Sequence, residues 1–277
     1  MKKLFFLFPL FATLQSGSAI QRIVGASQTG TVSYNTTDPG FTVAGGASTA
    51  AYVGQVTASS ASGTYLRNGW VLTAAHVAAG DFFLNNTTYT FDGQQQTIGQ
   101  SGPNDTVRAD LRLFHLTLSP NLAALTISST GPTALSPTNA GTQIEMIGYG
   151  GGQGETYGLN RVTGFASNLT VGSYTSDYFV TNFGTTTAGG NSATNEYLVV
   201  TGDSGGGDFA GSSGAYLLYG INGAVDSNKN SLFVQLSTYK SQIDTVTATP
   251  EPSTWTMLGL GGLMGAVVLY RRRRIAE

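Results

Sequence analysis

Short apolar runs alternate with clusters of Gly, Ser, Thr and Asn along most of the chain. The clusters recur about every 8–12 residues, a spacing typical of short antiparallel strands joined by tight turns. The predicted strands are Tyr52–Val56, Trp70–Thr73, Tyr89–Phe91, Leu111–Leu118, Gln143–Gly148, Arg161–Phe165, Tyr178–Asn182, Tyr197–Val200, Tyr216–Ile221 and Leu232–Gln235.

The strands fall into two sets, separated by a connector rich in Pro, Thr, Ser and Gly at Ser128–Gly141. A short terminal helix is expected at Ser237–Val246. The pattern predicts an all-β chain made of two small barrels in tandem, at about residues 39–127 and 140–247.

The start of the chain has the pattern of a secretory signal peptide. Lys2 and Lys3 precede the apolar run Leu4–Leu14, and Gly17 and Ala19 form a small-x-small cleavage site. We expect cleavage after Ala19. An N-terminal anchor is the alternative, but the run is short for a bilayer.

The other end has three parts: Pro250-Glu251-Pro252, an apolar segment at Trp255–Tyr270, and a basic block at Arg271–Arg274. The segment is marginal in length for a membrane helix, and the arginines would keep to the cytoplasmic side. This tail resembles the PEP-CTERM sorting signal of Gram-negative bacteria. The resemblance implies recognition by an exosortase, a sorting transpeptidase, at the inner membrane and export to the cell envelope or surface. A permanent C-terminal anchor is the alternative.

Composition narrows the classes of chemistry. The chain has 38 glycines, two histidines and no cysteine, which excludes disulfides and thiol catalysis and argues against a zinc site. We predict no metal and no cofactor. Acidic residues outnumber basic ones between residues 20 and 250, so no nucleic-acid partner is expected.

The strongest chemical motif is Gly202-Asp203-Ser204-Gly205-Gly206. A serine among glycines lets the backbone approach a substrate closely. The N–H groups of Gly202 and Ser204 can turn toward one point and form an oxyanion hole. Serine alone is a poor nucleophile and needs a base. A plain glycine-rich turn is the alternative.

The candidate base is His76, which follows an apolar strand and the small residues Ala74 and Ala75. Imidazole titrates near neutrality, as a group that acts as base and then as acid must do. The alternative is His115, which lies within a predicted strand. Asp110 is the favoured partner for the imidazole, over Asp105 in a turn-like segment.

These three segments resemble the signature segments of the trypsin-like (chymotrypsin-type) serine proteases, in that family's order of His76, Asp110 and Ser204. The resemblance implies two six-stranded antiparallel β-barrels, a short C-terminal helix and peptide or protein substrates. An α/β-hydrolase order fails because no histidine follows Ser204. A subtilisin-like order would need a partner before His76, such as Asp38.

The same resemblance places Leu198 at the base of the specificity pocket and Gly223 and Val225 on its wall. We therefore expect a preference for small or medium apolar side chains. Asp226 or Glu196 would change this preference if either pointed inward.

The resemblance also raises a question about activation. In the family, the aspartate before the nucleophile, here Asp203, often pairs with a newly freed N-terminal amine. The segment Arg22-Ile23-Val24-Gly25 looks like a site for such a cleavage.

Together these features predict an exported serine endopeptidase with a signal peptide (1–19), a peptidase domain (20–249) and a sorting tail (250–277). Its triad would form a covalent acyl-enzyme. The alternatives are an inactive homologue that binds partners and a structural surface protein.

Overall fold

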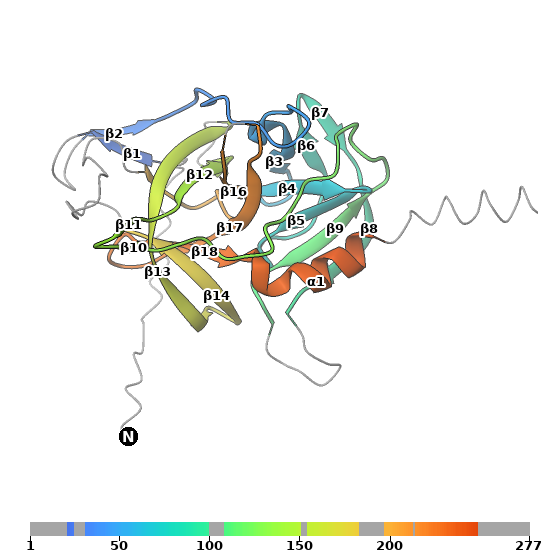
Figure 1. Ribbon diagram of the computed structural model, residues 1–277. Helices are drawn as coiled ribbons and strands as arrows, with labels where there is room; N and C mark the ends of the chain where they lie inside the picture. The colour runs from blue at the N-terminus through green and yellow to red at the C-terminus, as the bar shows by residue number, and fades with distance from the viewer. Residues whose placement is uncertain are drawn as a thin grey trace, which may run out of the picture.

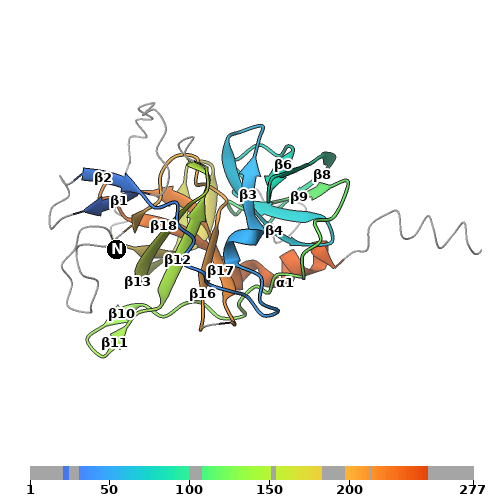
Figure 2. The ribbon, with the colours of Figure 1, turned by 90° about the horizontal axis from the view of Figure 1, so that it is seen from above.

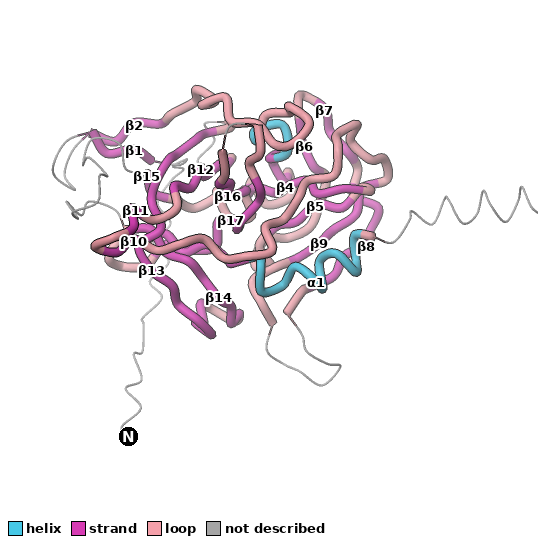
Figure 3. Tube along the Cα trace, viewed as in Figure 1, coloured by secondary structure: helices cyan, strands magenta, loops and turns pink. Residues whose placement is uncertain are grey.

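A computed structural model describes residues 21–24, 31–99, 108–150, 154–182, 197–212 and 214–248. Strands are the main regular secondary structure of these residues, and loops and turns connect them (Figure 3). The predicted signal peptide and the whole predicted sorting tail lie outside the described residues.

The N-terminal half (residues 41–127) is built on one antiparallel sheet. Its strands are β3 Val53–Val56, β4 Ala61–Arg67, β5 Trp70–Thr73, β6 Phe82–Leu84, β7 Thr87–Tyr89, β8 Phe91–Thr97 and β9 Arg112–Leu116. Their order is β7-β6-β3-β4-β5-β9-β8. All four residues of β5 are buried, as expected for apolar and β-branched side chains in a central strand.

The C-terminal half (residues 135–235) contains a closed six-stranded barrel in the order β12-β13-β14-β18-β17-β16. Its interior holds a compact apolar cluster in which the rings of Phe179 and Phe233 stack at 5.0 Å. The strands are β12 Gln143–Gly148, β13 Thr156–Val171, β14 Tyr174–Thr181, β16 Gly207–Ala210, β17 Leu217–Val225 and β18 Ser231–Gln235.

Smaller elements surround the two halves. One three-stranded sheet has the order β15-β1-β2, from β1 Gln21–Val24, β2 Thr31–Tyr34 and β15 Tyr197–Leu198. The hairpin of β10 Leu135–Ser136 and β11 Asn139–Ala140 lies in the predicted connector. A 3-10 helix, η1 Thr49–Tyr52, precedes β3 and is capped by Ser48.

The two halves lie side by side in both ribbon views (Figures 1 and 2). A single apolar cluster runs through both of them, with Tyr52 and Phe82 from the first half and Phe209 and Leu218 from the second. Burial of this shared surface fixes the halves against each other. The seam between them is therefore part of the core.

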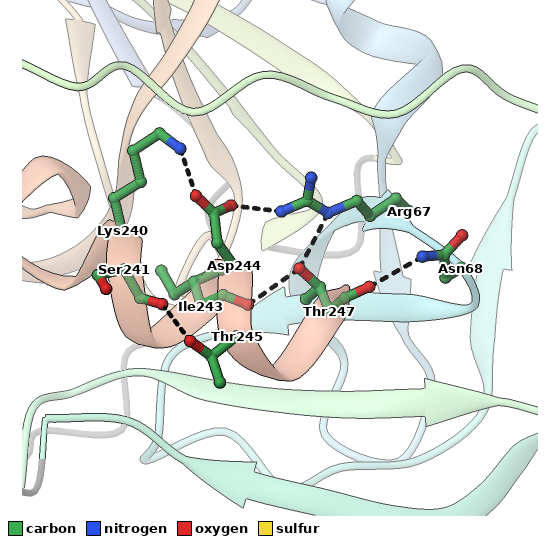
Figure 4. A network of polar contacts seen from close by, with 8 residues as sticks. All are labelled: Arg67, Asn68, Lys240, Ser241, Ile243, Asp244, Thr245 and Thr247. Atoms are coloured by element: carbon green, nitrogen blue, oxygen red, sulfur yellow. Dashed lines mark hydrogen bonds and ion pairs between the residues drawn. The ribbon is translucent and has the colours of Figure 1, made fainter. Parts of the chain in front are cut away.

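The helix α1 Leu236–Thr247 crosses from the second half to the first (Figure 1). The Asp244 carboxylate accepts hydrogen bonds from Arg67 and Lys240, and Arg67 Nε donates to Thr247 Oγ1 at 2.9 Å (Figure 4). Burial opposes ionisation of Asp244, but Lys240 and Arg67 lower its pKa below the ordinary value. The end of the chain's last helix is thereby tied to the end of β4.

Most of the sequence-based expectations for the fold are confirmed: two β-rich halves in tandem and a short terminal helix. One detail differs. The first half is a seven-stranded sheet, whereas six strands were expected. The difference lies in short strands that a pattern search does not resolve, since β6 and β7 have three residues each.

Candidate active site at the seam between the two halves

The position of His76 follows from strand β5. The buried strand ends at Thr73, and a tight turn with a Val77 N–H to Ala74 carbonyl bond of 3.0 Å carries His76. β5 pairs antiparallel with β9, with Thr73 opposite Arg112. Asp110 lies two residues before Arg112, so the register brings it beside the turn that holds His76.

The His76 ring and the Asp110 carboxylate are in direct contact. The distances from His76 Nδ1 to Asp110 Oδ2 and Oδ1 are 2.8 and 3.0 Å, and the His76 backbone N–H donates to Oδ1 at 3.1 Å. Asp110 is 3% exposed, whereas the His76 side chain is 42% exposed. A buried carboxylate thus orients an imidazole whose other side is accessible.

His115 lies at the opposite end of β5, paired with Trp70. Its ring is 4% exposed and is held at both nitrogens, with Nδ1 2.6 Å from Asp92 Oδ2 and Nε2 3.0 Å from the Asn68 carbonyl oxygen. Both nitrogens are occupied, so this histidine has a structural role. Asp105, the weaker aspartate candidate, lies outside the described residues.

Ser204 lies on a tight turn whose own backbone closes it. Asp203 N–H donates to the Val200 carbonyl at 3.0 Å, and Gly206 N–H donates to the Asp203 carbonyl at 2.9 Å. Gly202 has a φ of 95°. Among the described residues, the N–H groups of Gly202 and Ser204 donate no hydrogen bond to a backbone carbonyl. These two donors are the ones that the sequence predicted for an oxyanion hole.

Gly205 brings this turn against the strand that leads to His76. A Cβ at Gly205 would lie 2.1 Å from Thr73 Oγ1 and 3.0 Å from the Ala74 nitrogen, and its φ is 87°. Only glycine permits this approach. Between the side chains of His76 and Ser204 themselves, the described contacts include no hydrogen bond; such bonds often tighten only when substrate is bound.

Residues of the first half hold the same turn by its carbonyl groups. The Ser62 N–H donates to the Ser204 oxygen at 3.0 Å, Ser62 Oγ donates to the Gly202 oxygen at 3.0 Å, and Thr64 Oγ1 donates to the Gly205 oxygen at 3.2 Å. Strand β4 therefore fixes the serine turn relative to β5 and His76.

The sequence profile described as Trypsin matches residues 40–243, which cover both halves and all three segments above. The chain belongs to the trypsin family. A second profile, the PEP-CTERM protein-sorting motif, matches residues 248–274. This motif indicates export and cell-envelope association, and it implies recognition by an exosortase.

Solved structures with the same fold include the Rv3671c protease of M. tuberculosis in its inactive form, with 15% identity and a TM-score of 0.51. That match covers 73% of this chain and 91% of the other. Neuropsin of mouse brain matches at 15% identity and a TM-score of 0.48, over 71% of this chain and 94% of neuropsin. The HtrA-type protease AlgW with a decapeptide matches at 22% identity and a TM-score of 0.44, over 64% of this chain and 49% of AlgW. A search of the curated proteins gives no match.

The chymotrypsin-like fold expected for a trypsin-family chain is thus confirmed. In the part of the chain that the structure describes, no helix has the length and apolar character needed to cross a membrane. Nor does any group of three or more His, Asp or Glu side chains there have the geometry to hold a metal ion.

Asp203, which directly precedes Ser204, is fully buried. Its Oδ1 accepts the Gly150 N–H and its Oδ2 accepts the Val200 N–H, both at 2.9 Å. A Cβ at Gly148 would lie 2.4 Å from Asp203 Oδ1. Ile23, the residue of the possible activation cleavage, lies in β1, and its neighbour Arg22 pairs with Tyr197 of β15.

The predicted pocket residues lie on two segments that flank the serine turn. Leu198 is buried in β15, while Gly223 and Val225 lie on β17, where Val225 is 38% exposed. Asp226 is turned toward its own loop, because its carboxylate accepts the N–H groups of Asn228 and Asn230 at 2.8 and 2.9 Å. Glu196 lies outside the described residues.

Three carboxyl groups of the second half escaped the sequence reasoning: Asp208 and Glu145 are buried, and Glu155 is half-buried. Burial raises the pKa of Asp208, on β16, well above its ordinary value, and nearby Asp203 adds to the rise. Burial likewise raises the pKa of Glu145 to about 8 and that of Glu155 to about 7, with Asp38 adding to both. The sequence carried no signal for them, because isolated acidic residues in a strand pattern are usually at the surface.

Proposed function

We propose that this protein is an exported serine endopeptidase in which His76, Asp110 and Ser204 form the catalytic triad. The contact between His76 and Asp110, beside the turn that carries Ser204, supports this proposal most directly. The trypsin-family fold supports it as well, because that fold brings the same residue types together at the seam between two halves.

The chemistry follows from which nitrogen of His76 is engaged. Nδ1 faces Asp110, so its proton is held there and Nε2 is the nitrogen that accepts the Ser204 proton. The side-chain Oγ of Ser204 then forms a bond to the carbonyl carbon of the substrate, and the electron pair of the C=O bond moves onto the substrate's carbonyl oxygen. The N–H groups of Gly202 and Ser204 stabilise this oxyanion.

Collapse of the tetrahedral intermediate breaks the C–N bond, and His76 returns the proton to the leaving amine. The acyl group stays on Ser204 as an ester. Water then attacks the ester by the same route, with His76 again as base, and releases the second product. Asp110 holds the imidazole in place and stabilises the imidazolium form of His76.

For the substrate, we propose a small or medium apolar side chain at the cleaved bond, received by Leu198, Gly223 and Val225. The Asp226 carboxylate accepts hydrogen bonds from Asn230 within its own loop, which supports this preference because a carboxylate held there is not offered to a basic side chain. A panel of peptide anilides tests the proposal. A clear preference for Arg or Lys at the cleaved bond would contradict it.

For the location, we propose that residues 1–19 are removed on export and that residues 20–249 form the peptidase. The tail at residues 250–277 holds the chain at the inner membrane, through a helix at 255–270, until an exosortase acts on it. Mass spectrometry of the released protein tests this order of events. A mature protein that ends beyond Arg274 would contradict removal of the tail.

Labelling of the exported protein with a fluorophosphonate probe tests the activity. We expect a Ser204–phosphorus bond to form with loss of fluoride, and we expect no labelling of Ser204→Ala or His76→Ala. His115→Gln is the matched control and keeps its labelling. Absence of labelling in the folded wild-type protein would instead support an inactive binding module or a structural surface protein.

A further inference from the structure

Ser62, on β4 of the first half, is fully buried and uses every polar group it has at the seam. Its N–H donates to the backbone carbonyl oxygen of Ser204 at 3.0 Å, and its own carbonyl oxygen accepts a hydrogen bond from the Thr73 hydroxyl at 2.7 Å. Its hydroxyl oxygen is 3.0 Å from the Gly202 oxygen and 2.8 Å from the Tyr149 nitrogen. One small residue therefore joins the strand before His76, the serine turn and the end of β12.

The direction of the two hydroxyl contacts is determined by their partners. The Tyr149 backbone N–H can only donate, so Ser62 Oγ accepts there. The Gly202 carbonyl can only accept, so the single hydroxyl proton of Ser62 points at it. The hydroxyl is thus a fixed relay from the backbone of Tyr149 to the backbone of Gly202.

This relay acts on the peptide next to the two oxyanion-hole donors. Gly202 has a φ of 95° and no side chain that could hold it in one conformation. The direction of its carbonyl determines how the backbone continues from the Gly202 N–H to the Ser204 N–H. The Ser204 N–H is also set by the Asp203 carbonyl, which accepts the Gly206 N–H at 2.9 Å. The Gly202 carbonyl has its hydrogen bond from Ser62.

We propose that Ser62 is a positioning residue for the oxyanion hole, which it organises through Gly202. The inference rests on the proposed peptidase function. Pre-organised donors stabilise a developing oxyanion because they need no reorientation during the reaction. Loss of the Ser62 hydroxyl leaves the Gly202 carbonyl and the Tyr149 N–H without their partner, and the turn then samples other orientations.

The test compares Ser62→Ala with Ser128→Ala in the full exported protein. Ser128 is a matched control, because it is also buried and its hydroxyl donates to the Thr130 oxygen at 2.8 Å and accepts the Thr130 N–H at 3.3 Å, in the connector. Both variants lose one hydroxyl and two backbone contacts. A peptide anilide with alanine at the cleaved bond gives kcat and KM, and a peptide aldehyde of the same sequence gives an inhibition constant.

For Ser62→Ala we expect kcat to fall by about 10- to 100-fold with KM little changed, less than the ~10²–10³-fold loss for removal of a whole oxyanion donor. The aldehyde, whose adduct carries the oxyanion, should weaken by a similar factor. Ser128→Ala should keep kcat and aldehyde binding. Unchanged kcat in folded Ser62→Ala, or an equal loss in Ser128→Ala, would overturn the inference.

Two further variants keep the test decisive if Ser62→Ala does not fold. Ser62→Thr retains a hydroxyl donor and should keep the wild-type kcat. Ser62→Cys has a similar size, but its thiol is a weak donor, so its kcat should fall. Equal kcat values for the two would overturn the inference. A wild-type protein without activity would overturn the function and the inference together, whereas an active wild type with unaltered Ser62 variants would overturn the inference alone.

Discussion

Thr73 of β5 lies opposite Arg112 of β9 in an antiparallel pair. His76 follows the first residue by three positions, and Asp110 precedes the second by two. The end of β5 and the start of β9 therefore lie at the same end of the strand pair, where the His76 ring meets the Asp110 carboxylate at 2.8 Å. The serine turn reaches the same edge because Gly205 has no side chain to keep it away from Thr73.

Asp110→Asn should lower kcat by about 10⁴-fold while leaving KM nearly unchanged. An amide cannot stabilise the charged imidazolium, and its N–H₂ favours the wrong tautomer of His76. Steady-state kinetics on a peptide anilide measures the effect.

The matched control for that variant is Asp92→Asn, which alters the partner of His115 in the same way at 2.6 Å. It should lower the melting temperature without lowering kcat. If Asp92→Asn instead abolished activity and Asp110→Asn did not, His115 would replace His76 as the base.

Gly148→Ala should lower kcat because its methyl group would overlap Asp203 Oδ1, at 2.4 Å. The carboxylate would then lose its place between the N–H groups of Gly150 and Val200, and the turn that carries Ser204 would shift with it. We expect a loss of about 10²-fold or more, as for misplacement of reacting groups by about 1 Å, measured as kcat on a peptide anilide.

The same contacts predict that no free amine at Ile23 is needed, since two backbone N–H groups already serve the Asp203 carboxylate. Arg22→Gln, which removes the basic residue of the possible cleavage site, should therefore label at the wild-type rate. Loss of labelling in Arg22→Gln, restored by a chain that begins at Ile23, would show that activation by cleavage operates after all.

Glu145 should make the protein less stable as the pH rises. Burial raises its pKa from 4.5 to about 8, and the charges of Asp38 and Glu155 add to the rise. Between these two values the folded state binds more protons than the unfolded state, so the free energy of unfolding falls with pH. This stabilisation is complete below pH 4.5 and is lost as the pH rises through about 8.

Urea unfolding of wild type and Glu145→Gln at pH 5 and pH 8 measures that dependence. Glu145→Gln should have the smaller difference between the two pH values, and Glu155→Gln should remove a further part, since burial also raises the pKa of Glu155 to about 7. An identical pH dependence in wild type and Glu145→Gln would contradict the assignment.

The local chemistry of the site was readable from the sequence. The run Trp70–Leu72 is apolar, and Thr73 and small residues follow it, so a strand that delivers His76 to a turn could be predicted. The glycines around Ser204 marked a close backbone approach. Strand patterning also predicted two β-rich halves, because alternation and turn residues are local properties of the chain.

Only the tertiary structure decided how the segments meet. The choice of His76 over His115 depends on the register between β5 and β9. This register places His76 beyond the C-terminal end of β5 and His115 beside Asp92. The role of Ser62 had no signature at all, since its partners at Tyr149 and Gly202 are 87 and 140 residues away. Contacts between distant segments arise from packing of the two halves, and a local pattern of polar and apolar residues carries no information about them.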